Sequence, residues 1–244
     1  MQLQLGEVSA IIISSPDLAK EVLKTHDTAF ANRPSVLAVD VLSYGYSGIV
    51  FTPYGDYWRQ IRKICVVELL SAKRVLSFRS VREEEACNLV ESISLYGGFP
   101  INLSEKIFSF TNRIASRAAF GKKCKYEKEF ISLVKEGFSL SGGFKVPDVF
   151  PSLKFLAFLT GLKPAVEKIH RKMDKILDDI IEEKMQTITT TKDDDIVDVL
   201  LQLRETGGLD FNITRNHIKA VTLVRNNASK IYEFITEISQ KKEN

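Results

Sequence analysis

Cysteine is scarce in this sequence: Cys65, Cys87 and Cys124 are the only three among 244 residues, and they form no CxxC pair. Cysteines this far apart indicate neither a disulfide framework nor a zinc cage, and they fit a reducing compartment. Cys65 and Cys87 fall in helical patterns, so both are predicted to be small buried hydrophobic residues. No residue is predicted to ligate a metal.

Long apolar runs are also missing. A membrane-spanning helix needs roughly 20 consecutive apolar residues, and no stretch here approaches that length. The first residues, Met1-Gln2-Leu3-Gln4-Leu5-Gly6, lack the basic-then-apolar shape of a signal peptide. The sequence alone therefore predicts a soluble, cytoplasmic chain without a transmembrane anchor, or one that rests on a membrane surface.

Basic residues do not cluster either. The net charge of +3 is spread along the chain, without a basic run or interleaved aromatic residues. Such a distribution gives no groove for a phosphate backbone. Nucleic acid is not an expected partner.

The hydropathy pattern predicts a mainly α fold with a small N-terminal β-hairpin. Residues 2–5 alternate in polarity, Gly6-Glu7 makes a turn, and Val8 to Ile13 is a branched apolar run, which together are typical of a hairpin. Ser15-Pro16-Asp17 then predicts the start of a helix. Apolar spacings of three and four predict further helices at Val75–Ile93, Leu103–Phe120, Tyr126–Leu140, Val166–Met185 and Ile196–Leu203.

The stretch from Val149 to Leu159 is the most apolar and aromatic part of the chain. It is too short to span a bilayer, but it could dip into a membrane surface or line an apolar pocket. Packing in the core between two helices is an equally good interpretation from composition alone.

The only tryptophan lies in the segment Tyr54-Gly55-Asp56-Tyr57-Trp58-Arg59-Gln60-Ile61-Arg62-Lys63. After Gly55 the pattern is helical, so Trp58 and Arg62, four residues apart, share one face. An indole N–H and a guanidinium are donors without acceptors, and together they suit a small paired anion such as a carboxylate. The alternative is a core tryptophan beside a solvated arginine.

Other segments accompany this one in a fixed order: Leu3-Gln4-Leu5-Gly6-Glu7-Val8, Ala19-Lys20-Glu21-Val22-Leu23-Lys24-Thr25-His26-Asp27, Phe30-Ala31-Asn32-Arg33-Pro34 and Arg117-Ala118-Ala119-Phe120-Gly121-Lys122-Lys123-Cys124. Together they resemble the plant cytochrome P-450 family of haem-thiolate monooxygenases, specifically the D-like branch of its seventy-one clan. The resemblance extends from Met1 to about Leu223. It implies a partial cytochrome P-450 fold over residues 1–223, followed by a divergent tail at 224–244.

The resemblance implies haem as the cofactor, with Trp58 and Arg62 holding its propionates. It implies substrate contact by the segment from Tyr44 to Val50, in particular Tyr44, Tyr46, Ile49 and Val50, and by Phe144. It also implies that residues 144–159 form a loop that rests on the endoplasmic reticulum membrane. The partners implied are a hydrophobic small-molecule substrate and NADPH-cytochrome reductase.

Three of the family's motifs are absent from these 244 residues: the F-x-x-G-x-R-x-C-x-G loop that supplies the iron-ligating cysteine, the acidic-threonine motif of the central helix, and the E-x-x-R pair. No catalytic residue is therefore assigned, and whether this chain is itself an enzyme stays open. After Leu223 the sequence departs from the family, which is the pattern of a frameshift, a retained intron or a truncated gene. The amino end likewise begins inside the family's first strand.

The leading hypothesis is a fragment of a haem-dependent monooxygenase whose full-length relatives hydroxylate hydrophobic small molecules, such as terpenoids, with O₂ and NADPH-derived electrons. The fragment alone is expected to be inactive. The alternatives are a noncatalytic helical protein that binds a membrane surface or a partner, and a pseudogene product. Helices left without their family neighbours would expose apolar faces, so marginal stability is also expected.

Overall fold

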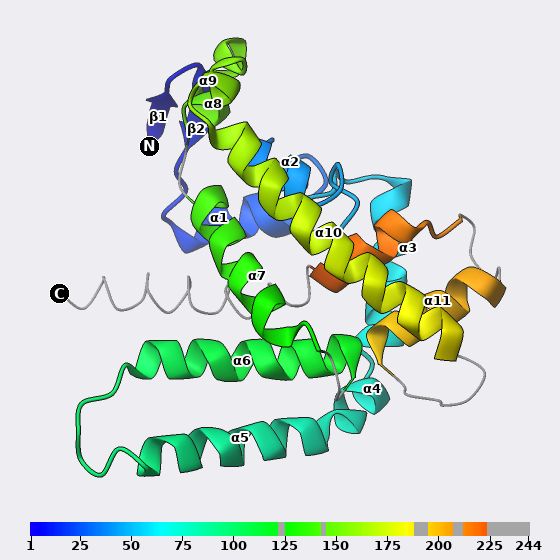
Figure 1. Cartoon of the computed structure of the whole chain (residues 1–244). Helices are drawn as coiled ribbons and strands as arrows, with labels where there is room; N and C mark the ends of the chain where they lie inside the picture. Colours follow the sequence, from blue (N-terminus) through cyan, green and yellow to red (C-terminus); the bar gives the residue numbers. More distant parts are fainter. Residues whose placement is uncertain (122–124, 143–144, 188–194, 207–211, 224–244) are drawn as a thin grey trace.

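The computed structural model describes residues 1–121, 125–142, 145–187, 195–206 and 212–223. These residues form one two-stranded antiparallel sheet and a set of helices, as predicted (Figure 1). The strands are β1 (Gln2–Leu5) and β2 (Val8–Ile11). The helices are α1 (Pro16–Lys20), α2 (Leu37–Leu42), α3 (Asp56–Ile64), α4 (Ala72–Ser77), α5 (Arg79–Ser94), α6 (Leu103–Phe120), α7 (Glu127–Ser141), α8 (Val146–Val149), α9 (Leu156–Leu159), α10 (Leu162–Thr187) and α11 (Ile196–Thr206).

Shorter helical turns extend or join several of these elements. Two π-helical turns, Glu21–Thr25 and Cys65–Leu69, continue α1 and α3, and a 3-10 turn at Pro151–Leu153 joins α8 to α9. Residues 215–223 are also helical. Among the described residues, no helix is both long enough and apolar enough to cross a membrane.

The hairpin forms where the alternation predicts it, with Leu5 paired to Val8 across the turn. Gly6 has a φ of +63°, and a Cβ there would lie 2.4 Å from the carbonyl oxygen of Val149. Only glycine combines that backbone angle with so close a neighbour. The hairpin consequently lies against the start of the 149–159 segment at one end of the molecule (Figure 1).

The helix starts follow local capping chemistry. Ser15 accepts a hydrogen bond from the Leu18 N–H, which confirms its predicted role as a cap. Asn102 caps α6 in the same way, through the N–H of Glu105, and α6 has the predicted bounds. The predicted helix from Val75 to Ile93 is instead two helices, because the chain turns at Phe78 between α4 and α5.

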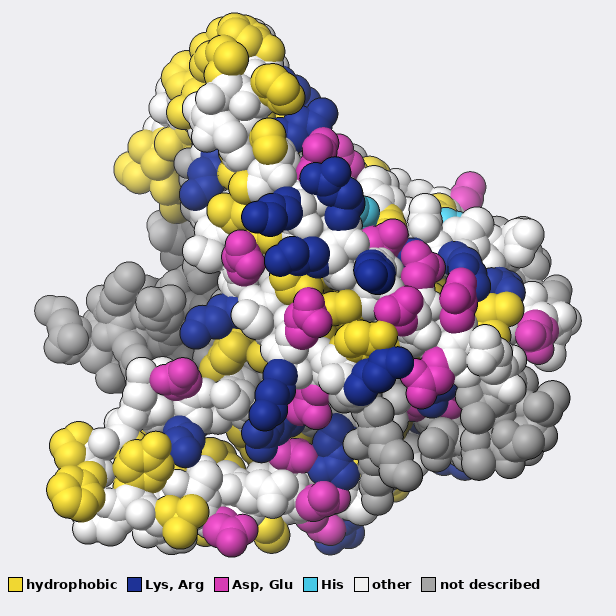
Figure 2. All heavy atoms as spheres, in the orientation of Figure 1, with side chains coloured by type: hydrophobic (Ala, Val, Ile, Leu, Met, Phe, Trp, Pro, Cys, Tyr) yellow, Lys and Arg dark blue, Asp and Glu magenta, His cyan; other side chains and the backbone are white. Residues whose placement is uncertain are grey.

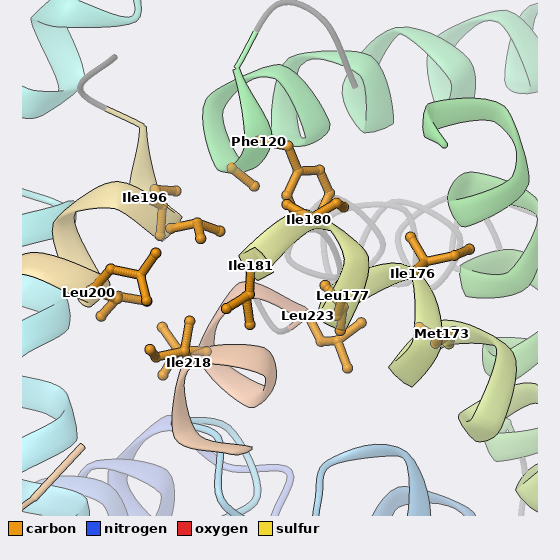
Figure 3. Packing of buried hydrophobic residues seen from close by; sticks show 14 of the residues in the cluster. Phe120, Met173, Ile176, Leu177, Ile180, Ile181, Ile196, Leu200, Ile218 and Leu223 are labelled. Carbon is orange, nitrogen blue, oxygen red and sulfur yellow. The ribbon is translucent and has the colours of Figure 1, made fainter. Parts of the chain in front are cut away.

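Helix α10 runs through the centre of the fold and organises the core (Figures 1 and 3). The apolar positions predicted for it are all buried: Val166, Ile169, Met173, Ile176 and Ile180. The last four pack with the buried faces of α7, α11 and residues 215–223. Figure 3 shows Ile181 of α10 close to Ile218 and Leu223, so the last described helix is part of the core.

Candidate functional site

Trp58 and Arg62 lie together on α3, as their spacing predicts. The Arg62 guanidinium carbon is 5.0 Å from the centre of the Trp58 ring, which is a cation–π contact. The indole N–H donates a 3.0 Å hydrogen bond to the backbone carbonyl of Ile49. The two side chains are therefore adjacent, but the indole donor is already used within the protein.

The pair leaves one cationic donor open to a bound anion. Arg62 is exposed, and no ion pair to it occurs within the described part of the chain, so its guanidinium can donate to a carboxylate. The half-buried Trp58 can offer its N–H to the same anion if it releases Ile49. Propionate binding by this pair stays a prediction.

An apolar pocket of about 270 Å³ lies where α2, α7, α10 and residues 215–223 meet, next to the segment that follows α2. We call it the α7–α10 pocket. Its lining is Val39, Leu42, Ser43, Val50, Phe51, Val134, Gly137, Phe138, Ser141, Gly142, Met173, Ala220 and Leu223. A lining with so few polar groups suits a hydrophobic small molecule.

Of the predicted substrate-contact residues, the structure places Val50 in the wall of this pocket. Tyr44 instead donates its hydroxyl to Asp174 at 2.9 Å, and Tyr46 bonds to the backbone of Val36. Ile49 packs against the core, and its carbonyl holds Trp58. Phe144 lies outside the described residues. Substrate contact by these residues stays a prediction.

Most of the residues that line the pocket were not predicted from the sequence. Val134 and Phe138 stand four residues apart on α7, and Met173 belongs to the apolar stripe of α10. Each was visible as an apolar helix position, but the spacing does not say whether such a residue fills the core or borders a pocket. Leu223 could not be found from local pattern, because its place depends on contacts across the fold.

The two cysteines that can be described differ. Cys65 is buried, as predicted, whereas Cys87 on α5 is exposed, so that prediction was wrong. The α5 sequence has little amphipathic character, and position 87 lies on its solvent side. Cys124 lies outside the described residues. No group of three or more potential metal ligands occurs within the residues that the structure describes.

The apolar 149–159 segment projects from the fold and is not buried in its core. Phe155, Phe158 and Leu159 are exposed, Ala157 is buried, and Val149, Leu153 and Leu156 are partly buried. We call these three exposed residues the apolar tip. Figure 2 shows hydrophobic side chains gathered at this end of the molecule, over α8, α9 and the hairpin. The exposure favours the surface interpretation of the segment over the core one.

The chain is similar to known proteins over most of its length. The cytochrome P450 family model matches residues 1–229, so the chain belongs to the cytochrome P450 family. It is 51% identical over 230 residues to melianol synthase from Azadirachta indica, 51% over 227 residues to premnaspirodiene oxygenase from Hyoscyamus muticus, and 50% over 229 residues to cytochrome P450 71D8 from Glycine max. The predicted resemblance to seventy-one-type plant cytochromes is confirmed.

In each of these comparisons the match covers 91% of this chain and 45–46% of the relative, so the chain spans about half the length of the relatives it matches. The fold is also found in solved structures. A zebra fish cytochrome P450 structure with progesterone aligns at a TM-score of 0.71 and 21% identity, covering 93% of this chain and 53% of that chain. The predicted partial cytochrome P-450 fold is thereby confirmed.

Proposed function

We propose that this chain forms the amino-terminal part of a haem-dependent monooxygenase that hydroxylates hydrophobic small molecules, terpenoids among them. The α7–α10 pocket is the observation that carries the proposal. Its wall combines Val50 and Phe51 with Met173 and Leu223, so segments far apart in the sequence meet around one apolar space. A ligand there would be held by shape and desolvation, with Ser43 and Ser141 as polar contacts.

The residues of this chain would bind the haem edge and orient the substrate. The chemistry at the iron needs residues that these 244 do not include. Arg62 and Trp58 would hold the two haem propionates at the edge of α3. When bound, a haem with a thiolate ligand supplies the electron donation that favours O–O cleavage. The cysteine loop is absent from these 244 residues, so we propose that the chain alone is inactive, with electrons reaching the complete enzyme from NADPH through a reductase.

A hybrid protein tests this proposal. Residues 1–223 would be joined to the part of premnaspirodiene oxygenase that follows the matched region, and the hybrid produced with a plant reductase. We expect a thiolate-type ferrous carbonyl spectrum and NADPH-dependent oxygenation of premnaspirodiene. A hybrid with that spectrum but no product from any apolar substrate would contradict the substrate class. A thiolate-type spectrum from the 244-residue chain alone would contradict its inactivity.

We also propose that the protein rests on the endoplasmic reticulum membrane through the apolar tip. Phe155, Phe158 and Leu159 are large apolar side chains on one projecting end, and transfer of such groups from water to lipid is favourable. The same tip would support a noncatalytic membrane-surface or partner-binding role. Vesicle binding by a chain that takes up no haem, combined with an inactive hybrid, would favour that second function.

A further inference from the structure

Three successive residues after α2 adopt left-handed backbone conformations. The φ angles are 57° at Tyr44, 68° at Gly45 and 60° at Tyr46. Glycine enters this region freely, but residues with a Cβ rarely do, and two tyrosines flanking one glycine are unusual. Local hydrogen bonds support the turn, among them the Tyr46 N–H to the Ser43 hydroxyl at 3.1 Å and the Gly45 N–H to the Asp40 carbonyl at 2.9 Å, and contacts from more distant residues add to them.

The Tyr46 hydroxyl makes a local contact. It accepts a 3.1 Å hydrogen bond from the N–H of Val36 and lies 3.2 Å from that residue's carbonyl oxygen. These bonds close the loop around α2 onto itself. They do not connect the turn to the rest of the fold.

Tyr44 makes the distant contact. Its hydroxyl donates to Asp174 of α10 at 2.9 Å, across 130 residues of sequence. Lys219 donates to the same carboxylate oxygen at 2.5 Å and to Asp178 at 2.7 Å. Lys219 also lies 5.7 Å from the centre of the Tyr44 ring, and the ring of His170 meets that of Tyr44 edge-on at 4.7 Å.

The surroundings of Asp174 strengthen its hydrogen bond with Tyr44. The side chain of Lys219 is only 5% exposed, and Asp174 is about one third exposed. A phenol donating to an ionised carboxylate makes a stronger hydrogen bond than a neutral pair does. Burial acts to raise the pKa of Asp174, but the hydrogen bonds from Lys219 and Tyr44 outweigh it and keep that pKa below its ordinary value. Asp174 therefore stays ionised at neutral pH and keeps Tyr44 bound.

The residues next to this cluster line the α7–α10 pocket. Ser43 precedes the turn, and Val50 and Phe51 follow it. Met173 is the neighbour of Asp174 on α10, and Ala220 is the neighbour of Lys219. The contact that fixes the turn thus joins three of the segments that line the pocket, and α2 and α7 supply the rest of the lining.

We propose that Tyr44 is a positioning residue that latches the loop 43–51 over the α7–α10 pocket through Asp174 and Lys219. When the latch is released, the left-handed turn relaxes, the loop loosens from α10, and an apolar ligand enters or departs. This inference rests on the proposed function and deepens it by assigning ligand access to the contact between the loop and α10. The loop is also held from α3, by the hydrogen bonds of Trp58 to Ile49 at 3.0 Å and of Tyr57 to Ser47 at 2.6 Å, and the variants below leave both in place. The latch itself is tested without any ligand.

The test is amide hydrogen exchange of the 244-residue chain, measured by mass spectrometry, with the variant Tyr44→Phe. This change removes the hydroxyl and keeps the ring. Because a hydrogen bond to a charged group is lost, we expect exchange in residues 43–51 to quicken by about tenfold or more, with α7 and α10 unchanged. The matched control is Tyr126→Phe, since Tyr126 donates to Asp179 on the same helix at 2.8 Å but lies outside the loop. It should leave 43–51 as in the unmodified chain.

Unchanged exchange in 43–51 in Tyr44→Phe, or an equal increase throughout the fold, would overturn the latch. If Tyr44→Phe does not fold, the exchange of the variant Asp174→Asn is measured in its place. Its amide oxygen still accepts from Tyr44 but loses the ion pair, so exchange in 43–51 should quicken relative to Tyr126→Phe, and no change there would also overturn the latch. Release of the uncharged dye N-phenyl-1-naphthylamine should quicken in the same variants. A chain that shows the exchange effect but binds no dye would keep the latch and count against the proposed function.

Discussion

The guanidinium of Arg62 lies over the ring of Trp58, whose N–H is engaged by the carbonyl of Ile49. Trp58 therefore ties α3 to the loop that borders the pocket, while Arg62 remains exposed on top of the ring. The two residues differ in what they do for the chain itself. Their substitutions should separate a stabilising role from a binding role.

Trp58→Phe is expected to lower the free energy of unfolding by about 1 kcal/mol or more, because it removes one hydrogen bond and part of a half-buried ring. Arg62→Ala should cost less than about 1 kcal/mol, since an exposed cation–π contact is worth little. Urea denaturation of the 244-residue chain measures both. A larger loss for Arg62→Ala than for Trp58→Phe would contradict this division.

In the hybrid with the relative's carboxyl half, Arg62→Ala should reduce the haem retained after gel filtration, while Arg62→Lys should retain an intermediate amount. A lysine keeps the charge but cannot make the planar two-pronged contact to a carboxylate. Arg59→Ala is the control, because Arg59 pairs with Asp56 at 2.5 Å on the exposed side of the same helix. Equal haem content in all three variants would contradict propionate binding by Arg62.

Lys184→Met should destabilise the fold by about 3–5 kcal/mol. Lys184 forms ion pairs with the buried Asp195 and Asp198 of the adjoining segment, and its removal leaves two buried carboxylates without their cation. Burial raises the pKa of Asp195 to about 6, so unfolding should be measured at pH 7.5, where that carboxylate is charged. Lys163→Met on the same helix breaks only an exposed pair with Glu167 and should change stability by less than about 0.5 kcal/mol.

His217 should make stability depend on pH. The His217 ring Nδ1 accepts a hydrogen bond from the Thr214 N–H at 3.2 Å, and the His217 backbone N–H donates to the Thr214 hydroxyl at 3.3 Å. This arrangement is a capping box with histidine as the third residue of the helix. Burial lowers the pKa of His217. The unfolded chain therefore binds the proton more readily, and this contribution to stability, present above the ordinary histidine pKa of about 6.5, is lost as pH falls.

His217→Gln keeps a side-chain acceptor at that position without titrating. Between pH 7.5 and 5.5 its free energy of unfolding should fall less than that of the unmodified chain. His170, whose pKa burial also lowers, titrates in both proteins, so the comparison isolates His217. Identical pH profiles for the two proteins would contradict a contribution of His217 to the pH dependence of stability.

The apolar tip should carry vesicle binding. Replacing both Phe158 and Leu159 by serine removes two side chains that are 69% and 73% exposed. Since each large apolar side chain contributes roughly 1.5–3 kcal/mol on burial, cosedimentation with phosphatidylcholine vesicles should weaken by at least about tenfold. The control replaces Leu95 and Phe99 by serine. These two exposed residues lie in the connection between α5 and α6, at the other end of the molecule from the apolar tip, and their replacement should leave binding unchanged (Figure 1).

Patterns of short range predicted much of this fold. The bounds of α6 follow from Asn102 and Gly121, and the buried stripe of α10 follows from its spacing. The contact of Trp58 with Arg62 also follows from a four-residue step. Each of these features is decided within a few residues, where propensity and periodicity act.

Features of long range could not be predicted in the same way. The Tyr44–Asp174 hydrogen bond joins positions 130 residues apart, and neither sequence neighbourhood marks it. The left-handed turn at 44–46 contains only one glycine. Its two tyrosines also adopt positive φ angles, which local sequence preference disfavours. The exposure of Cys87 depends on which face of α5 meets α6, and the weak amphipathic pattern of α5 does not decide that.

The amino-terminal hairpin is held by residues made much later. The Glu7 N–H donates to Val149 at 2.8 Å, and Ser152 binds the Glu7 side chain across 145 residues. At ribosomal rates of about 5–20 residues per second, the hairpin waits roughly 7–30 s for these partners. A lone two-stranded hairpin is marginally stable in water. The hairpin is thus synthesised well before the partners on which it docks, and during that interval its strand edges are open to chaperones and to other nascent chains.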